Sequence, residues 1–246
     1  MREIRIGMLT PSSNTALEPA LAAMAADLPG LRIHVSRFRV TEISLSPAGL
    51  DQFALAPMVA AAELLADAEV DAIAWNGTSA SWLGFARDEA LCGRITAATG
   101  IPATSATLAF RDAFRALGSA RIGLATPYTT DVQDRIRAVW GEAGLPCMAE
   151  RHLGLSHNFA FAAVAEETVS RLVREVAAEG CDAAAVVCTN LRGTAGAPAL
   201  ERELGIPVLD SIAVTLWGAL RLLSVDTAPL ARWGRLFALR PVGASA

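Results

Sequence analysis

Three blocks of sequence occur twice along this 246-residue chain, in the same order each time. The repeated pairs are residues 5–11 (RIGMLTP) with 121–127 (RIGLATP), 71–79 (DAIAWNGTS) with 182–190 (DAAAVVCTN), and 100–105 (GIPATS) with 205–210 (GIPVLD). Each block is an apolar run closed by a short loop sequence, which is typical of a buried strand and its exit. Ordered repetition of such units indicates two homologous α/β halves, and we expect a ligand site between them.

The segments around these blocks predict strands that alternate with helices in both halves. Predicted strands cover 3–9, 32–40, 70–75, 121–126, 147–153 and 183–188, and predicted helices cover 16–26, 57–68, 131–143 and 160–179. Such alternation is typical of parallel sheets with helices on both faces. We therefore predict two pseudo-symmetric, doubly wound α/β halves with flavodoxin-like sheets, the first formed by 1–115 plus 213–246 and the second by 116–212. Ligands bind beyond the carboxyl ends of strands in such sheets, which places the active site in the cleft between the halves.

Composition argues against several classes of partner. The net charge is −4, and the 21 basic residues are all Arg, scattered singly rather than gathered into the basic stripe that nucleic acid requires. The absence of Lys removes both the P-loop lysine and the Schiff-base nucleophile. Charged residues interrupt every long apolar stretch before it reaches the ~20 residues of a membrane span. We expect a cytoplasmic protein with neither a nucleic-acid nor a membrane partner.

Cysteine and histidine usage predicts no metal site. The four cysteines are Cys92, Cys147, Cys181 and Cys188, none of them in CxxC spacing, and the chain has three His. A zinc site needs a tighter cluster of these side chains. We interpret Cys92, Cys147 and Cys181 as structural thiols.

The loop Gly77-Thr78-Ser79 follows a predicted buried strand and offers backbone N–H groups and two hydroxyls. These groups can cradle a carboxylate, although Thr and Ser can also cap the next helix. The same position of the second half carries Thr189-Asn190. Two such loops facing each other favour a small carboxylate or dianionic substrate.

Cys188 stands at the end of the second half's buried strand, immediately before Thr189. A lone buried cysteine is commonly an inert small hydrophobe. At a strand end, however, a thiol can exchange a proton with a ligand, and its thiolate is a good carbon base when desolvated. We therefore identify Cys188 as the candidate catalytic group.

Tyr128 is the single tyrosine, placed where the second half's first strand ends. Either packing or hydrogen bonding to developing negative charge would explain it, and we favour the oxyanion donor. Asn158 follows His157 in another strand-end loop, where ligand binding and helix capping stay open. Asp210 and Ser211 likewise face the cleft or cap the final helix.

These residues resemble the aspartate/glutamate racemase superfamily, in which each of two α/β halves places a cysteine beside a carboxylate substrate. Two branches are similar along nearly the whole chain. Motifs that look like maleate cis-trans isomerase are Pro11-Ser12-Ser13-Asn14-Thr15, Ser156-His157-Asn158 and Cys188-Thr189-Asn190. Motifs that look like arylmalonate decarboxylase are Gly77-Thr78-Ser79, Ala125-Thr126-Pro127-Tyr128 with Asp131-Val132, the single Cys188, and Gly234-Arg235-Leu236-Phe237.

The resemblance places the family's first cysteine on Gly77, so one thiol of the pair is missing. It implies a cofactor-independent decarboxylase of a substituted malonate, in which Cys188, Tyr128, Thr78 and Ser79 are catalytic. It also implies a substrate-binding set of Gly77, Thr189, Asn190, Asn14, Ser13, Pro11 and Asn158. The polar Ser12-Ser13-Asn14 loop departs from the decarboxylase branch and indicates a more polar diacid. The alternatives are an isomerase or racemase of a small carboxylic acid and a non-catalytic carboxylate-binding protein, and the oligomeric state is open.

Overall fold

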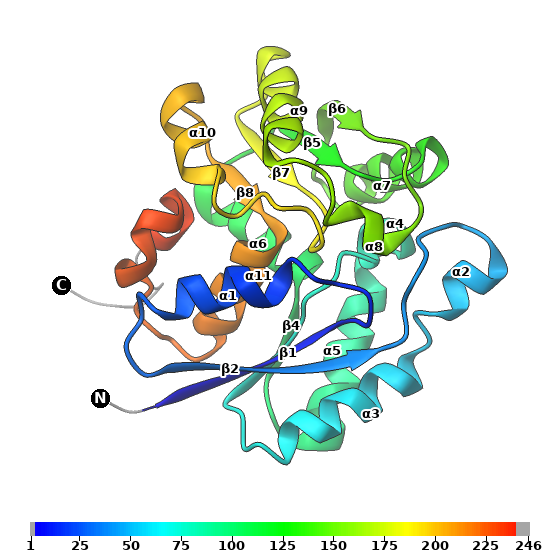
Figure 1. Ribbon diagram of the computed structural model, residues 1–246, viewed down its shortest axis with the longest axis vertical. Helices are drawn as coiled ribbons and strands as arrows, with labels where there is room; N and C mark the ends of the chain where they lie inside the picture. Colours follow the sequence, from blue (N-terminus) through cyan, green and yellow to red (C-terminus); the bar gives the residue numbers. More distant parts are fainter. Residues whose placement is uncertain (1–2, 240–246) are drawn as a thin grey trace.

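Two four-stranded parallel sheets form the framework of the protein in a computed structural model, which describes residues 3–239. The strand orders are β2-β1-β3-β4 and β6-β5-β7-β8, so the second sheet repeats the first (Figure 1). The strands are β1 (Ile4–Pro11), β2 (Leu31–Phe38), β3 (Ala72–Trp75), β4 (Ala103–Ser105), β5 (Ile122–Thr126), β6 (Cys147–His152), β7 (Ala183–Val186) and β8 (Val208–Asp210). The duplicated α/β fold predicted from the sequence is confirmed.

Helices cover both faces of these sheets, because the inner strands β3 and β7 are apolar throughout. Every residue of β3 and β7 is buried, as expected for parallel strands packed on both faces. The helices are α1 (Leu17–Ala25), α2 (Pro47–Asp51), α3 (Leu55–Ala66), α4 (Ala80–Leu83), α5 (Phe85–Thr99), α6 (Ala106–Leu117), α7 (Thr130–Glu142), α8 (Asn158–Phe161), α9 (Glu166–Ala178), α10 (Ala197–Leu204) and α11 (Ser211–Leu222), with two 3-10 helices, η1 (Ala228–Trp233) and η2 (Arg235–Ala238).

Helix α11 returns the chain to the first half. It packs against α6, β3 and β4, and it is buried along nearly its whole length (Figure 1). The predicted grouping of 1–115 with 213–246 requires this packing of α11 against the first half. Residues 1–2 and 240–246 of that grouping lie outside the described part. The division at 116 and 212 itself stays a prediction.

The predicted helix over 160–179 is wrong, because the structure has two helices there. α8 ends at Phe161, and α9 begins at Glu166 after a turn in which the N–H of Val164 donates to the carbonyl of Phe161. Phe161 is fully buried against Tyr128, with ring centroids 5.6 Å apart. Anchoring this ring inside the protein fixes α8, and the chain must turn before α9 can cover β5, β6 and β7.

One stretch, Pro47–Ala66, has the length and hydropathy of a membrane span. The structure divides it into α2 and α3, with a break at residues 52–54. α3 then packs on β1, β2 and α5, where Met58 and Leu65 are buried. The buried face of α3 therefore belongs to the core of the first half, whereas Leu64 on its other side is exposed.

Candidate active site

The two sheets place Gly77 and Cys188 at equivalent positions. The N–H of Asn76 donates to the carbonyl of Leu9 at 2.9 Å, and the N–H of Val187 donates to the carbonyl of Ala125 at 2.9 Å. Each bond is the last link between the third strand and the first strand of its half, and the next residue is Gly77 in one half and Cys188 in the other. The sequence repeat is thus matched by equivalent backbone geometry.

Thr78, Tyr128 and Cys188 form a chain of hydrogen bonds across the boundary between the halves. Thr78 Oγ1 and Tyr128 Oη lie 2.8 Å apart, although 50 residues separate them in sequence. The Tyr128 hydroxyl also lies beside the thiol of Cys188, near enough for each group to shift the pKa of the other. Three of the four predicted catalytic side chains are therefore connected through the Tyr128 hydroxyl.

Burial keeps the Cys188 thiol protonated at neutral pH. Only 2% of the residue is exposed, and this desolvation raises the thiol pKa to about 12. Hydrogen bonds from the Asn190 N–H, at 3.4 Å from Sγ, and from Tyr128 lower the pKa and only partly offset the burial. A neutral thiol is a proton donor, and the same two bonds would stabilise the thiolate that remains after transfer.

Two aromatic rings pack against the ring of Tyr128. Trp82 lies with its ring centroid 5.3 Å from that of Tyr128, and Phe161 lies at 5.6 Å, both edge to face. Burial, with the adjacent Cys188 as the next cause, raises the Tyr128 pKa well above its ordinary value. The phenol stays neutral and keeps its proton for donation in an apolar setting, where hydrogen bonds to charge are strong.

Ser79 is positioned by its neighbours on the same strand and loop. It occupies the N-cap position of α4, yet its side chain makes no capping bond. Its hydroxyl instead accepts a hydrogen bond from Trp75 Nε1 at 3.4 Å. The Ser79 side chain therefore does not serve as a cap, and its hydroxyl proton is available to another acceptor.

Asparagine side chains connect the remaining loops. Asn14 Nδ2 donates to the carbonyl of Thr189 at 2.9 Å, and Asn190 Nδ2 donates to the carbonyl of Asn158 at 2.6 Å. Asn158 Nδ2 in turn donates to Ser13 Oγ at 2.7 Å. The structure thus brings together five of the predicted substrate-binding residues. Their substrate-binding role stays a prediction.

The same asparagines also cap helix α1. Asn14 Oδ1 accepts from the N–H groups of Ala16 and Leu17, both at 3.0 Å, and Asn190 Oδ1 accepts from the N–H of Thr15 at 2.9 Å. The carbonyl of Pro11 accepts from the N–H of Asn14, which closes the turn before the helix. A substrate that bound these amides would have to replace bonds that already hold α1 in place.

Asp210 is a cap in the structure. Its Oδ1 accepts from Thr194 Oγ1 at 2.6 Å and from the N–H groups of Ile212 and Ala213 at the start of α11. Its Oδ2 is buried without a hydrogen-bond partner in the described region, and burial raises the carboxyl pKa to about 6. Ser211 donates to the carbonyl of Val186. The capping alternative is the one that the geometry supports.

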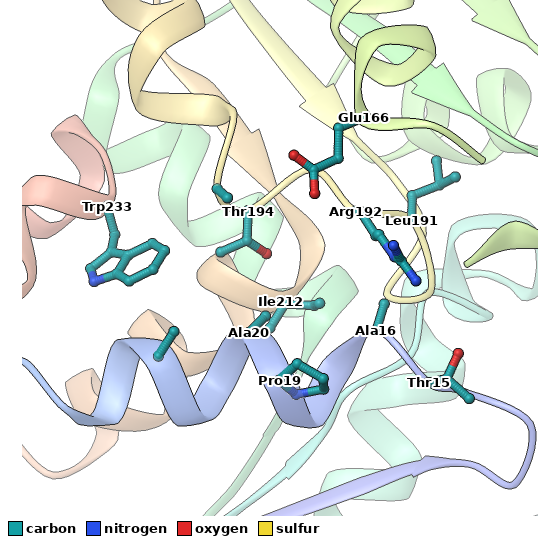
Figure 2. Close-up of a pocket in the computed structure, with 12 residues that line it drawn as sticks. Thr15, Ala16, Pro19, Ala20, Glu166, Leu191, Arg192, Thr194, Ile212 and Trp233 are labelled. Carbon is teal, nitrogen blue, oxygen red and sulfur yellow. The ribbon is translucent and has the colours of Figure 1, made fainter. Parts of the chain in front are cut away.

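A cavity of about 410 Å³ lies between helix α1 and the loop that follows Asn190 (Figure 2). It is lined by Thr15, Ala16, Pro19, Ala20, Ala23, Glu166, Leu191, Arg192, Thr194, Ala195, Ile212 and Trp233. Neither Cys188 nor Tyr128 lines it. These two residues and Thr78 are at most 4% exposed, so a substrate can reach them only after the surrounding loops separate.

Two features of the site were missed by the sequence analysis. One is the aromatic wall of Trp82 and Phe161, and the other is Trp75, whose indole lies over Gly77. The only sequence signal for the latter is the i, i+2 spacing, which puts both residues on one side of an extended strand. Within residues 3–239, no group of three His, Cys, Asp or Glu side chains could hold a metal ion.

Two repeated α/β halves that meet at a buried thiol and a set of hydroxyl groups match the class of protein that the sequence resembles, the aspartate/glutamate racemase superfamily. Within that class the chain belongs to the arylmalonate decarboxylase family, whose sequence profile matches residues 6–237.

Relatives in this family are enzymes of two kinds. The chain is 32% identical to arylmalonate decarboxylase of Bordetella bronchiseptica over 235 residues, which cover 94% of this chain and 95% of the relative. It is 27% identical to maleate isomerase of Nocardia farcinica, over 91% of this chain and 92% of the relative. The chain thus belongs to a family of enzymes that contains both a lyase and an isomerase.

Solved structures of both kinds share the fold. A liganded arylmalonate decarboxylase, in which a glycine is changed to cysteine and a cysteine to serine, superposes with a TM-score of 0.81 at 28% identity. That match covers 95% of this chain and 98% of the other. A Nocardia farcinica maleate cis-trans isomerase with a covalently bound succinylcysteine intermediate has a TM-score of 0.88 at 24% identity, over 95% and 98% of the two chains.

Proposed function

We propose that this protein is a cofactor-independent decarboxylase of an α-substituted malonate, with Cys188 as its single proton donor. The observation that carries the proposal is the asymmetry of the two equivalent strand ends. One end holds a buried thiol that is protonated at neutral pH, and the other holds glycine. A site with one proton donor suits a reaction that adds one proton to one face of a planar intermediate.

The donors around Cys188 would hold the substrate by one carboxylate. Thr78, Ser79 and Tyr128 offer hydroxyl protons, and the backbone N–H of Asn190 points at the Cys188 sulfur. When the bond to the second carboxylate breaks, carbon dioxide leaves and its electron pair passes into an enediolate. The oxygens of the enediolate carry more negative charge than the ground-state carboxylate, so these donors stabilise the intermediate preferentially.

Protonation completes the reaction without a cofactor. The S–H bond of Cys188 breaks as its proton moves to the α-carbon, and the thiolate then takes a proton from water. The bonds from Tyr128 and from the Asn190 N–H lower the thiol pKa and so stabilise that thiolate while it lasts. Trp82 and Phe161 would provide an apolar environment for the substituent and for the departing carboxylate, although destabilisation of the ground state is a contested account of catalysis.

An isomerase of a small diacid is the second candidate, and the asparagine network favours it. The chain carries amide side chains at three strand-end loops, which suits a second carboxylate on the substrate. The glycine at residue 77 argues against covalent attack on a double bond, because that position supplies no nucleophile. A racemase meets the same difficulty, since it needs an acid or base on each face.

A reaction screen with matched variants tests the proposal. The wild-type protein would be incubated with 2-methyl-2-phenylmalonate, with maleate and with a chiral α-aryl carboxylate in D₂O, following carbon dioxide, fumarate and α-deuterium respectively. We expect carbon dioxide release that Cys188→Ala abolishes and that Cys147→Ala, at a half-buried thiol on β6, leaves unchanged. Fumarate formation without carbon dioxide release would establish the isomerase instead. Binding of the malonate without any turnover would leave a carboxylate-binding protein.

A further inference from the structure

The indole of Trp75 occupies the space that a side chain at residue 77 would need. A Cβ built on Gly77 would lie no more than 2.5 Å from three ring carbons of Trp75, namely Cε2, Cζ2 and Cη2. Carbon atoms that are not bonded pack at ~3.5–4.0 Å, so the two groups cannot share this volume. Any side chain at residue 77 and the indole in its present place are mutually exclusive.

Several contacts hold the indole where it is. Trp75 is fully buried, its ring centroid lies 5.1 Å from that of Phe38, and its Nε1 donates to Ser79 Oγ. It also ends a central strand, beside Leu9 of β1. Moving so large a buried ring would cost packing with Phe38 and the hydrogen bond to Ser79 together.

We propose that Trp75 determines the stereochemistry of the reaction by forming the wall of the site opposite Cys188. This inference rests on the proposed decarboxylase function. Residues 77 and 188 are equivalent in the two halves, so a group at residue 77 would face the planar intermediate from the side away from Cys188. The indole fills that place with a ring that can neither give nor take a proton at carbon. The intermediate is then protonated from the Cys188 side only, and the product is a single enantiomer.

The steric part of the proposal is tested without any activity measurement. Melting temperatures would be compared for Gly77→Cys, Trp75→Leu, the double variant and a control, Gly93→Cys. Gly93 is an exposed helix residue whose Cβ would meet nothing within 4 Å. We expect Gly77→Cys to lower the melting temperature by ~4–10 °C in the wild-type background, as for an overpacked core, and by much less in the Trp75→Leu background. Equal losses in both backgrounds would overturn the claim that the two residues compete for one volume.

The facing geometry is tested by cross-linking. A short bifunctional thiol reagent should join the introduced thiol to Cys188 in Trp75→Leu/Gly77→Cys, as detected by peptide mass spectrometry. The control Trp75→Leu/Gly77→Ser should show reagent attached at Cys188 and at the half-buried Cys147, but no cross-link between residues 77 and 188. If the double variant folds and both thiols react without becoming joined, residue 77 does not face Cys188 and the wall is misplaced. This outcome is independent of what reaction the protein performs.

The stereochemical part is tested by product analysis with the malonate substrate. Wild type should give one enantiomer, and Gly77→Cys alone should be weakly active with the same enantiomer in excess. The double variant should give a mixture and should exchange the product's α-hydrogen with deuterium. Wild type that forms a racemic product would overturn the role of Trp75. If wild type releases no carbon dioxide from any malonate, the proposed function fails, whereas the melting and cross-linking results still decide whether the indole replaces a facing side chain.

Discussion

The two halves of this protein share a strand order but differ in what their third strands deliver to the site. In the first half β3 ends in Trp75, and its loop brings Gly77, Thr78 and Ser79 directly into α4. In the second half β7 leads to Cys188, and ten residues separate β7 from α10. In the proposed mechanism the first half supplies the hydroxyl groups of Thr78 and Ser79 and the wall formed by Trp75, and the second half supplies Tyr128 and the proton of Cys188. A duplicated scaffold has kept its hydrogen-bonding frame while the reactive position diverged.

The loops after the first strands differ in the same way. Asn14 of the first half is used to fasten Thr189 and the start of α1. Tyr128 of the second half has its hydroxyl in contact with Thr78 and Cys188. Equivalent loops thus hold a structural asparagine in the first half and a proposed catalytic tyrosine in the second, and the candidate site needs residues from both halves.

Removing the Cys188 thiol should abolish the difference between the two halves, and it should have the largest effect on kcat. Cys188→Ala deletes the only proton donor of the proposed mechanism, and we expect kcat to fall by at least ~10²–10⁴-fold, with the fold retained. Carbon dioxide release and circular dichroism check these two expectations. The variant Cys147→Ala serves as the control, and a Cys188→Ala protein within a few-fold of wild type would remove Cys188 from the mechanism.

Removing a donor from either half should have the next largest effect. We expect Tyr128→Phe and Thr78→Ala each to lower kcat by ~10²–10³-fold with a smaller change in KM, because the lost bond is stronger to the enediolate than to the substrate carboxylate. Steady-state kinetics measure both constants, with Thr96→Ala on the exposed side of α5 as the control. A higher KM at unchanged kcat would show that these residues only bind substrate.

Buried carboxyls in both halves should make stability depend on pH in the same direction. Burial raises the pKa of Asp210 from 3.8 to about 6 and that of Asp88 from 3.8 to about 7. A raised carboxyl pKa means that the folded state holds more protons than the unfolded state between these values, so stability falls as pH rises through that window. We expect Asp210→Asn to remove on the order of 3 kcal/mol of this decline between pH 4 and 6.

The matching change in the first half is Asp88→Asn, which should flatten the decline up to pH 7. Urea unfolding at a series of pH values gives the free energy of unfolding for both variants. A pH dependence identical to that of wild type would mean that the carboxyl in question is already ionised in the folded state. Comparing the two variants then shows which buried carboxyl contributes more to the pH dependence of the unfolding free energy.

The smallest expected effect comes from the helix cap of the first half. Ser105 caps α6 by accepting from the N–H of Leu108 at 3.1 Å, at the position equivalent to Asp210. We expect Ser105→Ala to cost about 1 kcal/mol of unfolding free energy. Asp210→Ala should cost more, since it also leaves Thr194 without its acceptor. Equal costs in urea unfolding would contradict this ranking.

Most of the fold could be predicted from the internal repeat, because a repeated apolar block that ends in loop residues is a strong signal for a buried strand. The contact between Thr78 and Tyr128 also follows from placing both at the carboxyl ends of strands. The break between α8 and α9 could not be foreseen, because it depends on Phe161 packing against Tyr128. The local sequence around Phe161 does not show that its ring will pack against a residue as distant in sequence as Tyr128.

The partners of the asparagines were beyond sequence reasoning for a related reason. Asn14 and Thr189 are 175 residues apart, and their bond depends on how the two sheets are set against each other. Strand patterns predict which residues lie at the edge of a sheet, but they do not predict the relative position and orientation of the two sheets. The indole over Gly77 likewise depends on a rotamer that Phe38 and Ser79 select.

The chain leaves the first half after α6 and returns to it with α11, which implies an order of folding. Until α11 packs, β3 and β4 lack part of their cover, and bringing α11 back requires closing a long loop at an entropic cost. A second half that has already folded holds β5 and β8 on either side of β7, which shortens the effective loop. We expect the second half to fold first, so that Thr78 meets Tyr128 only late in the process.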